Sequence, residues 1–414
     1  MKRRDFLHYT TGTVATASLL SVTETFAKIN VRQSPEVIVV GAGVFGMWSA
    51  FYMQELGAKV TVIDAYGPAN SRASSGGETR LLRADYGERL LYSKMNIESH
   101  GLWDSWQKEW GRQIMYPTGY LKMGDDDYSS SALAAQNRLK KLDIPSELLG
   151  YEELKYRWPQ INFQGLTTGL YYPGGPGGST LMAREALQLV NEKFQEKGGK
   201  FIIGKAKAGE VVNGKVSAIE LEDGQKINAD QVVFSCGPWM GKIFPELFGD
   251  RLDVTRRDVL FVGPKAGDNS YSDPQFPAWS FMNAEDSRYY GFPDLQGRGL
   301  KVAPYPDKNE IDMDSDDRLT NLYEIKRVRK FVNKRFPGLK DQPITETRVC
   351  QITNSFDSHF IVDTHPNADN FWFACAGSGH AFKHGPALGK YVAERIIQDK
   401  KVEEYDEAFR LKES

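Results

Sequence analysis

The stretch of sequence that decides the fold runs from Val37 to Asp64 and reads VIVVGAGVFGMWSAFYMQELGAKVTVID. Its first four residues are β-branched, which is typical of a strand buried on both faces. A glycine-rich turn follows, and a helical run then extends to Leu56, where Gly57 is placed to end the helix. A second β-branched strand ends at the acid. The order is therefore strand, glycine turn, helix, strand and acid.

Each glycine of the turn has a separate physical function. Gly41 makes the tight turn, Gly43 lets the backbone approach a pyrophosphate, and Gly46 lets the helix pack against the strand. The helix N-terminus offers free N–H groups and a partial positive charge to phosphate oxygens, and Asp64 stands where a carboxylate accepts a ribose hydroxyl. The alternative is a glycine-rich turn in another kind of α/β protein. The dinucleotide-binding residues predicted from this motif are Gly41, Gly43, Val44, Phe45, Gly46 and Asp64.

The composition has no strong charge bias. The chain has 414 residues, enough for two domains or one large one, and 41% of them are hydrophobic. Lysine and arginine total 52 against 54 aspartates and glutamates, for a formal net charge of −2, which argues against nucleic acid or an anionic membrane as the main partner. Cys236, Cys350 and Cys375 are too few for a disulfide framework. His380 and His384 lie four residues apart without a nearby acid, so we predict no metal site.

The N-terminal residues resemble an export signal. Two adjacent arginines in Lys2-Arg3-Arg4-Asp5 precede an apolar pair, as in twin-arginine signals. A mildly apolar segment and Thr25-Phe26-Ala27, a suitable cleavage site, follow. We therefore predict a signal peptide over 1–27, the twin-arginine export machinery as a partner, and a periplasmic or exported protein. The alternative is a disordered basic leader. The segment is too short and polar to span a bilayer, so no stable membrane insertion is expected.

Further glycine-rich loops follow predicted strands. A Ser/Gly-rich loop from Ser71 to Gly77 can wrap a second nucleotide surface, and residues 78–83 are expected to be helical, so that Arg80 and Arg83 share a face. A strand over 171–172 enters a glycine-rich loop, and a capped helix is expected to begin near Ser179. The segments expected to form a β-meander are 200–203, 211–212, 216–221 and 226–227.

The two ends of the chain share one pattern. A buried strand over 232–234 enters a turn with Gly237 and Trp239, and another over 371–375 enters a glycine loop before a helix over 386–397. We infer that the ends fold together and that the middle forms a second, antiparallel region. The predicted fold class is α/β, with a Rossmann-type domain and an interwoven antiparallel-sheet substrate domain. The predicted segments are 36–115, 180–253 and 350–414 for the first domain and 116–179 and 254–349 for the second.

Four separated motifs carry a resemblance to a known family. They are Thr79-Arg80-x-x-Arg83, Tyr290-Gly291-Phe292-Pro293 followed by Gly299-Leu300-Lys301, Cys350-Gln351-Ile352-Thr353-Asn354, and Gly377-Ser378-Gly379-His380-Ala381-Phe382-Lys383. In this order they resemble the monomeric sarcosine oxidase and N-methyltryptophan oxidase family, flavoproteins with a D-amino-acid-oxidase-like fold. The resemblance covers nearly all of the chain after the signal. It implies FAD as the cofactor, molecular oxygen as a reactant and a monomer.

The resemblance also implies roles for individual residues. Cys350 aligns with the cysteine that bonds covalently to the flavin, and a thiolate is a suitable nucleophile for this bond; the alternative is a buried core cysteine. Arg83 and Lys383 align with the cations that hold the substrate carboxylate. Arg80, beside the flavin, and Tyr290 align with active-site residues. The remaining residues that the resemblance places at the cofactor are Arg72, Thr79, Val212, Gly237, Trp239, Gly377, Gly379, His380 and Lys383.

Lys301 aligns with a lysine that activates oxygen in this family. A fixed cation at ~4 Å from a developing negative charge contributes about 4 kcal/mol at an effective dielectric constant near 20, or roughly a thousandfold in rate. The alternative is a surface lysine in a strand. We list Lys301, Arg80 and Tyr290 as the predicted catalytic residues.

Three positions depart from the family pattern. Tyr305 and Gly76 stand where histidines are common, and Ile352 stands where a tyrosine is common. These changes alter the size and polarity of the pocket, so a bulkier or more apolar N-substituted amino acid is an alternative substrate to sarcosine. The predicted reaction is the FAD-dependent oxidation of a secondary, N-methyl or cyclic, amino acid, with hydrolysis of the imine and reduction of oxygen to hydrogen peroxide. The alternatives are a dehydrogenase that passes electrons to a carrier and a non-catalytic flavin-binding module.

Overall fold

A computed structural model describes residues 34–283, 289–305 and 311–412. The predicted signal peptide lies outside these residues. The described residues from Ser34 onward form one compact unit. Among them, none of the helices has both the length and the apolar character needed to cross a bilayer.

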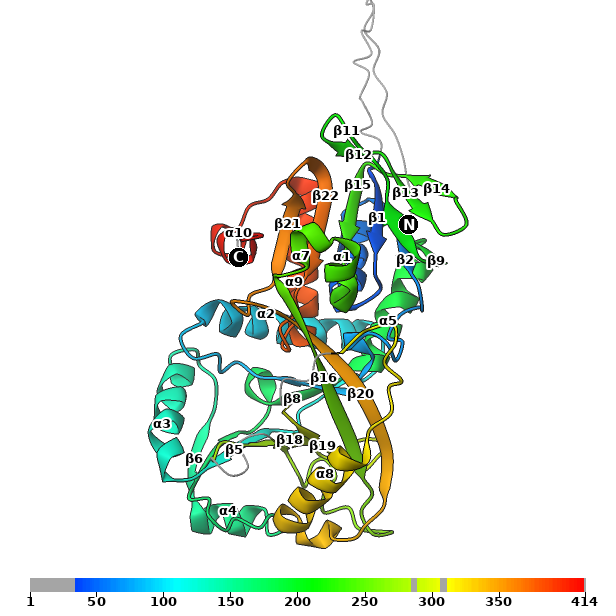
Figure 1. Cartoon of the computed structure of the whole chain (residues 1–414). Coiled ribbons are helices and arrows are strands. Elements are labelled where there is room, and N and C mark those ends of the chain that lie inside the picture. The colour runs from blue at the N-terminus through cyan, green and yellow to red at the C-terminus, as the bar shows by residue number, and fades with distance from the viewer. Residues whose placement is uncertain (1–33, 284–288, 306–310, 413–414) are drawn as a thin grey trace, which may run out of the picture. The chain divides into compact units, whose positions relative to one another are not determined.

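A six-stranded sheet carries the glycine motif (Figure 1). β1 lies near its middle and pairs in parallel with β2 and with β15. β15 in turn pairs in parallel with β22, from the C-terminal part of the chain, so the two ends of the chain fold together as predicted. Only the edge strand β21 pairs antiparallel within the described sheet. In spatial order the strands are β21 (Ile361–His365), β22 (Ala368–Cys375), β15 (Gln231–Phe234), β1 (Glu36–Val40), β2 (Lys59–Asp64) and β9 (Lys200–Ile203).

Two glycine-mediated close approaches connect this sheet to its helices. Helix α1 (Val44–Glu55) begins directly after the turn, and helix α9 (Gly385–Gln398) packs against α1. A Cβ atom on Gly46 would lie 1.9 Å from the carbonyl oxygen of Gly41, which confirms that this glycine permits the packing of helix on strand. Gly389 of α9 is equally necessary, because a Cβ atom there would lie 2.5 Å from the backbone of Trp48. The helices therefore pack at backbone distance, and Trp48 is fully buried between them.

An eight-stranded sheet forms the second large layer. Its longest pair is β16 with β20, which runs from Leu252 opposite Ser355 to Val262 opposite Ile344. Only the β17–β5 pair is parallel among its described pairs. In spatial order the strands are β20 (Ile344–Ser355), β16 (Leu252–Val262), β19 (Leu300–Pro304), β18 (Tyr289–Phe292), β17 (Ala278–Phe281), β5 (Tyr120–Gly124), β7 (Thr168–Tyr172) and β6 (Glu147–Gly150).

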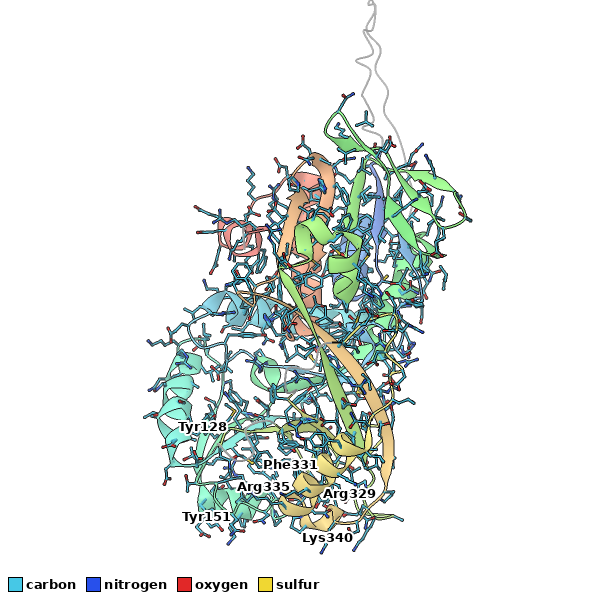
Figure 2. All side chains as sticks on the ribbon, viewed as in Figure 1. Tyr128, Tyr151, Arg329, Phe331, Arg335 and Lys340 are labelled. Carbon is cyan, nitrogen blue, oxygen red and sulfur yellow. The ribbon has the colours of Figure 1, made fainter. Side chains whose placement is uncertain are left out.

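Helix α8 (Leu322–Arg335) packs against one face of this sheet. Phe331 stacks on Tyr289 of β18 with ring centroids 3.8 Å apart, and the fully buried Arg335 donates hydrogen bonds of 2.8 Å to the carbonyl oxygens of Asn162 and Gln164. Both side chains are labelled in Figure 2, on α8. The opposite face of the sheet is thereby left for the cavity described below.

Smaller elements complete the described structure. The remaining sheets are β3 (Thr79–Leu82), β8 (Ser179–Met182) and β4 (Met115–Tyr116); β10 (Ala206–Ala208), β13 (Ala218–Leu221) and β14 (Lys226–Asn228); and the hairpin β11 (Val211–Val212) with β12 (Lys215–Val216). The other α-helices are α2 (Leu90–Glu109), α3 (Asp126–Lys140), α4 (Tyr151–Arg157), α5 (Ala183–Glu196), α6 (Met240–Ile243), α7 (Pro245–Phe248) and α10 (Glu403–Phe409). The 3₁₀-helices are η1 (Ser74–Gly76), η2 (Gly175–Gly177), η3 (Gly237–Trp239), η4 (Pro337–Leu339) and η5 (Phe382–His384).

The predicted fold class is confirmed, but three local predictions are wrong. Residues 79–82 form a strand, because β8 offers them an antiparallel partner. For the same reason residues 179–182 are extended, and the helix expected at Ser179 begins at Ala183. β9, expected in the meander, instead extends the parallel sheet beside β2. In each case a partner distant in the sequence decides the local structure.

The expected segment boundary at Cys350 falls inside a strand. β20 pairs with β16 on both sides of this residue, so Cys350 belongs to the eight-stranded sheet although it was assigned to the start of a dinucleotide-binding segment. The other domain boundaries stay a prediction.

Candidate active site

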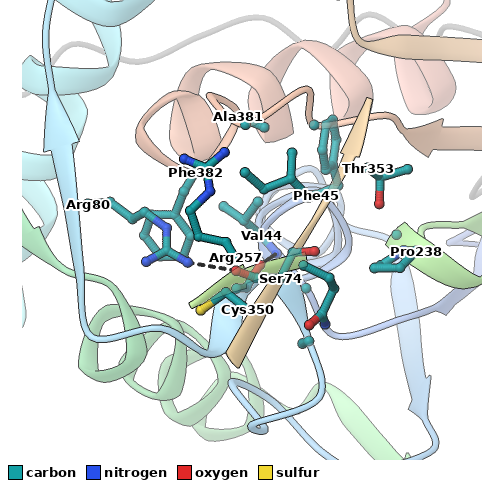
Figure 3. A pocket seen from close by; sticks show the side chains of 18 of the residues that line it. Val44, Phe45, Ser74, Arg80, Pro238, Arg257, Cys350, Thr353, Ala381 and Phe382 are labelled. Carbon is teal, nitrogen blue, oxygen red and sulfur yellow. Dashed lines mark hydrogen bonds between the residues drawn. The ribbon is translucent and has the colours of Figure 1, made fainter. Parts of the chain in front are cut away.

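One cavity of about 950 Å³ lies between the two large sheets. Its lining combines the ends of β1, β2, β15 and β22 with residues of β16, β18, β19 and β20. Figure 3 shows part of this lining, in which Arg80, Arg257 and Cys350 surround the same space as Val44 and Phe45 of α1. Open parallel sheets bind ligands at the carboxyl ends of their strands, so the position is the one expected for a dinucleotide.

The glycine turn forms one end of the cavity. Gly41 has a φ of +105°, and a Cβ atom on it would lie 2.4 Å from the carbonyl oxygen of Ser235. Asp64 accepts hydrogen bonds from the backbone N–H groups of Ala42 at 2.7 Å, Tyr66 at 2.8 Å and Gly67 at 2.9 Å. Burial raises the pKa of the Asp64 carboxyl, and these three donors oppose that shift by stabilising the carboxylate. The turn and the acid are therefore fixed in position by backbone contacts.

The lining suits a long ligand with polar edges. The hydroxyls of Ser74, Ser235 and Thr353 are buried and have no hydrogen-bond partner among the described residues. Buried polar groups are normally paired, so these hydroxyls await a ligand or water. The α1 N-terminus and the open backbone at Gly43 suit a pyrophosphate. These features fit a flavin adenine dinucleotide, which the turn, Asp64 and the three hydroxyls would hold.

Lys301 is almost completely buried beside β3. Only 3% of the residue is exposed, and its Nζ atom donates to the hydroxyl of Thr79 at 2.9 Å and to the Thr79 carbonyl at 3.1 Å. Burial, with the charge of Arg80 as the next cause, lowers the pKa of Lys301 to about 7. Arg80 itself donates to the carbonyl oxygen of Ser74 at 2.7 Å (Figure 3) and to that of Thr79 at 2.8 Å. The two cations are held by neutral oxygens.

Arg83 and Lys383 both contact Tyr86. The Arg83 guanidinium lies 4.5 Å from the centre of the tyrosine ring, and Lys383 Nζ donates to the Tyr86 hydroxyl at 2.8 Å and to the His380 carbonyl at 3.0 Å. Burial and then the charge of Arg83 lower the pKa of Lys383 far below its ordinary value. An anion bound here would offset that repulsion, so the pair is suited to a carboxylate.

Both histidines make polar contacts within the protein. The ring of His384 shares a 2.8 Å hydrogen bond with the Tyr86 hydroxyl, and His380 contacts the carbonyl of Ser358 at 3.1 Å. Burial lowers the pKa of both imidazoles well below the ordinary value, which favours their neutral forms. Within the described residues no group of histidines, cysteines and acids could hold a metal ion.

Most of the predicted site residues line this one cavity. They are Gly41, Gly43, Val44, Phe45, Asp64, Thr79, Arg80, Arg83, Gly237, Trp239, Tyr290, Lys301, Cys350, Gly377, Gly379, His380 and Lys383. The structure thus brings together residues from both ends and the middle of the chain. Their roles toward a cofactor or a substrate stay predictions.

Three predicted cofactor residues do not line the cavity. Val212 is 55% exposed in the β11–β12 hairpin, because the turn at Asn213-Gly214 carries it outward. Arg72 contributes its carbonyl oxygen to Gln351 and Arg318, while its guanidinium lies 5.1 Å from the ring of Tyr66. Gly46 faces the backbone of Gly41 and has a packing function.

Neither Arg257 nor Tyr305 is among the site residues predicted from the sequence. Both line the cavity, and the Arg257 guanidinium lies 5.0 Å from the centre of the Tyr305 ring. A signal for Arg257 was present: it follows Arg256 and precedes Asp258 in a strand, and alternation places neighbouring side chains on opposite faces. The alternation does not say which of the two arginines faces the cavity. The structure shows that it is Arg257, because Arg256 pairs with Asp258 and Asp316.

A parallel sheet with this glycine turn, beside a cavity rich in buried cations, defines a dinucleotide-dependent enzyme. The family described as FAD dependent oxidoreductase matches residues 36–395, so the chain belongs to this family and has FAD as its cofactor.

Several characterised proteins are similar over most of their length. Monomeric sarcosine oxidase from Bacillus sp. (strain B-0618) is 28% identical over 88% of this chain and 93% of its own. N-methyl-L-tryptophan oxidase from Yersinia pestis (strain Pestoides F) is 27% identical over 88% of this chain and 95% of its own. The solved structure of NikD, an amino acid oxidase essential for nikkomycin biosynthesis, has a TM-score of 0.77 at 19% identity, over 92% of this chain and 98% of its own. The similarity to NikD shows the fold alone.

The burial of Lys301 predicts a pH-dependent stability. Its pKa of about 7 lies below the ordinary value in an unfolded chain. Between these two values the unfolded chain binds more protons than the folded one, so this residue makes the free energy of unfolding rise with pH. Lys301→Met should be more stable than wild type below pH 7, by up to about 5 kcal/mol, and should lose this advantage toward pH 10.

Urea unfolding between pH 6 and pH 9.5 measures this difference. Lys155→Met, at an exposed position of α4, serves as the control and should leave the pH profile unchanged. A Lys301→Met variant whose stability ran parallel to that of wild type at every pH would contradict the assignment.

Proposed function

We propose that this protein oxidises a secondary amino acid, N-methylated or cyclic, and reduces oxygen to hydrogen peroxide. The observation that carries the proposal is the placement of Arg83, Lys383 and Lys301, all buried or half-buried, around one cavity beside the glycine turn. The similarity to a sarcosine oxidase and to an N-methyl-L-tryptophan oxidase supports the same class of substrate. When bound, FAD would accept an electron pair from the substrate and return it to oxygen.

Arg83 and Lys383 would hold the substrate carboxylate. A guanidinium offers two parallel N–H donors and a lysine adds a point charge, a combination suited to a carboxylate. Because Lys383 is 6% exposed and repelled by Arg83, the protonated lysine gains most from a bound anion. Binding the carboxylate would therefore orient the substrate and fix the charge on Nζ together.

Lys301 would supply the charge for the oxygen reaction. Its Nζ atom is fixed by two contacts to Thr79 and is shielded from bulk water. A cation that does not have to reorient stabilises the negative charge that develops on oxygen at little reorganisation cost. No carboxylate side chain lines this part of the cavity within the described residues, so we expect the substrate amine to bind in its neutral form without a side-chain base.

A peroxide-coupled screen of N-methyl, cyclic and primary amino acids tests the proposal. The wild-type enzyme should release peroxide with at least one secondary amino acid. Arg83→Gln and Lys383→Gln should each lower kcat/KM by about tenfold to a hundredfold, because each loses a charged hydrogen bond of about 1.5–3 kcal/mol. Arg112→Gln is the charge-matched control, because Arg112 forms an exposed ion pair with Glu192 and does not line the cavity.

The outcomes of the screen separate the alternatives. Bleaching of the flavin by substrate without peroxide in air would make the protein a dehydrogenase that uses another electron carrier. An absence of bleaching with every amino acid would favour a non-catalytic flavin-binding module.

We also propose that Cys350 bonds covalently to the flavin. The cysteine is free, half-buried and part of the cavity lining. Acid-precipitated wild-type protein should stay yellow, and Cys350→Ser should release the colour into the supernatant. Cys236→Ser, at the dinucleotide end of the same cavity, should keep the colour in the pellet. A colourless wild-type pellet would contradict the bond.

Export through the twin-arginine pathway stays a prediction from the sequence. The mature protein should begin near Lys28 and occur outside the cytoplasm. Mass spectrometry of the N-terminus in fractionated cells tests this. An intact Met1 in the cytoplasmic fraction would contradict export.

A further inference from the structure

We propose that Arg257 binds a second acidic group of the substrate, so that the enzyme acts on a dicarboxylic secondary amino acid. This inference rests on the proposed function of the cavity and adds a substrate class to it. It also departs from the alternative of a bulkier or more apolar substrate, because Arg257, which lies beside the Tyr305 ring, is a cation.

Arg257 occupies a defined place in the eight-stranded sheet. In the pairing of β16 with β20 it lies directly opposite Cys350, and both residues line the cavity. Its guanidinium lies 5.0 Å from the ring centre of Tyr305 and 5.8 Å from that of Tyr290. Two aromatic rings hold the guanidinium and leave its N–H donors available for an anion.

The guanidinium has no polar partner among the described residues. The Arg257 side chain forms no hydrogen bond or ion pair with them, and its Nε atom is buried without an acceptor. The neighbouring Arg256 differs in this respect, because it pairs with Asp258 at 3.1 Å and with Asp316 at 2.7 Å on the other face of the strand. In β16, Arg256 is therefore neutralised by acids on the face away from the cavity, whereas Arg257 faces the cavity without a neutralising acid among the described residues.

The charges around Arg257 do not balance without a ligand. The cations that line this end of the cavity are Arg80, Arg83, Arg257, Lys301 and Lys383. The carboxylates in the described lining are committed elsewhere: Asp64 accepts backbone N–H groups at the glycine turn, and Asp314 pairs with Lys242 at 2.6 Å. A single substrate carboxylate occupies Arg83 and Lys383 and still leaves Arg257 unpaired.

A single small molecule with two carboxylates can bind both to the Arg83–Lys383 pair and to Arg257. Arg83, Arg257 and Tyr305 line the same cavity, and the ring centre of Tyr305 lies 5.0 Å from the Arg257 guanidinium. A buried or half-buried charge without a counter-charge is costly, and a carboxylate matches the planar fork of a guanidinium. The second carboxylate can belong to the amino-acid side chain or to the N-substituent, and the substrates below distinguish these two sources.

The binding test uses the flavin-loaded enzyme and unreactive acids. Malonate, succinate, glutarate and adipate are titrated beside acetate, propionate and butyrate, and the change in flavin absorbance gives each Kd. Wild type should bind one dicarboxylate at least about tenfold more tightly than the monocarboxylates. The chain length of that acid measures the separation of the two binding points.

The variants assign this preference to Arg257. Arg257→Gln should remove the dicarboxylate preference and leave the monocarboxylate Kd within about twofold, whereas Arg257→Lys should restore part of it. Arg112→Gln is the charge-matched control and should behave as wild type. If wild type shows no preference for any dicarboxylate, or if Arg257→Gln weakens both classes of acid equally, the proposal is wrong.

The oxidation test compares substrates that differ by one carboxylate. N-methyl-L-aspartate and N-methyl-L-glutamate place it in the side chain, iminodiacetate places it on the N-substituent, and N-methyl-L-alanine and sarcosine lack it. At least one dicarboxylic substrate should exceed its monocarboxylic counterpart about tenfold in kcat/KM, and Arg257→Gln should bring the ratio close to one. Equal rates on both classes in wild type would overturn the proposal.

The two tests separate this inference from the proposed function. Tight dicarboxylate binding that depends on Arg257, without oxidation of any amino acid, would support the Arg257 site and contradict the proposed oxidase. Oxidation of monocarboxylic amino acids, without a dicarboxylate preference in either test, would support the oxidase and contradict the role of Arg257.

Discussion

Three backbone segments approach one another closely at Gly41, and the arrangement of the six-stranded sheet, helix α1 and the cavity follows from this contact. A side chain at this position would meet the carbonyl oxygen of Ser235 at 2.4 Å, and one at Gly46 would meet Gly41 itself at 1.9 Å. β1 pairs in parallel with both β2 and β15. The turn therefore lies beside Asp64, which ends β2, and beside Ser235, which follows β15. Helix α1 then begins with its N-terminus toward the same space.

The eight-stranded sheet completes that space and gives it its charge. Lys301 and Arg257 come from two of its adjacent strands, and Arg80, Arg83 and Lys383 reach the cavity from outside this sheet. Positive charges that are partly removed from water carry a desolvation penalty unless an anion binds beside them. The lowered pKa values of Lys301 and Lys383 express this cost, since burial is the first cause of each. The cavity therefore suits anionic ligands, and in the proposed function a substrate carboxylate would contribute to its charge balance together with the cofactor.

How far the sequence predicts each element depends on whether its determinants are local. The strand–turn–helix around Gly41 and the strands at 232–234 and 371–375 could be predicted because a short run of β-branched or aromatic residues followed by glycines is a local signal. Residues 78–83 were predicted wrongly because their conformation depends on pairing with β8, a hundred residues away in the chain. Val212 was placed at the cofactor by resemblance, yet a local Asn-Gly turn holds it in an exposed hairpin.

The sequence by itself determined the class of the protein: the glycine turn with its acid indicated a dinucleotide, and four motifs indicated a flavin-dependent oxidase. Most of the site residues that it indicated do line the cavity. Only the tertiary structure decided which polar residues meet there. The pairing of β16 with β20 turns Arg257 toward Cys350, and it sends Arg256 to the acids on the other face. The physical reason is that a side chain's charge partners are set by strand register and burial, which depend on residues far apart in the chain.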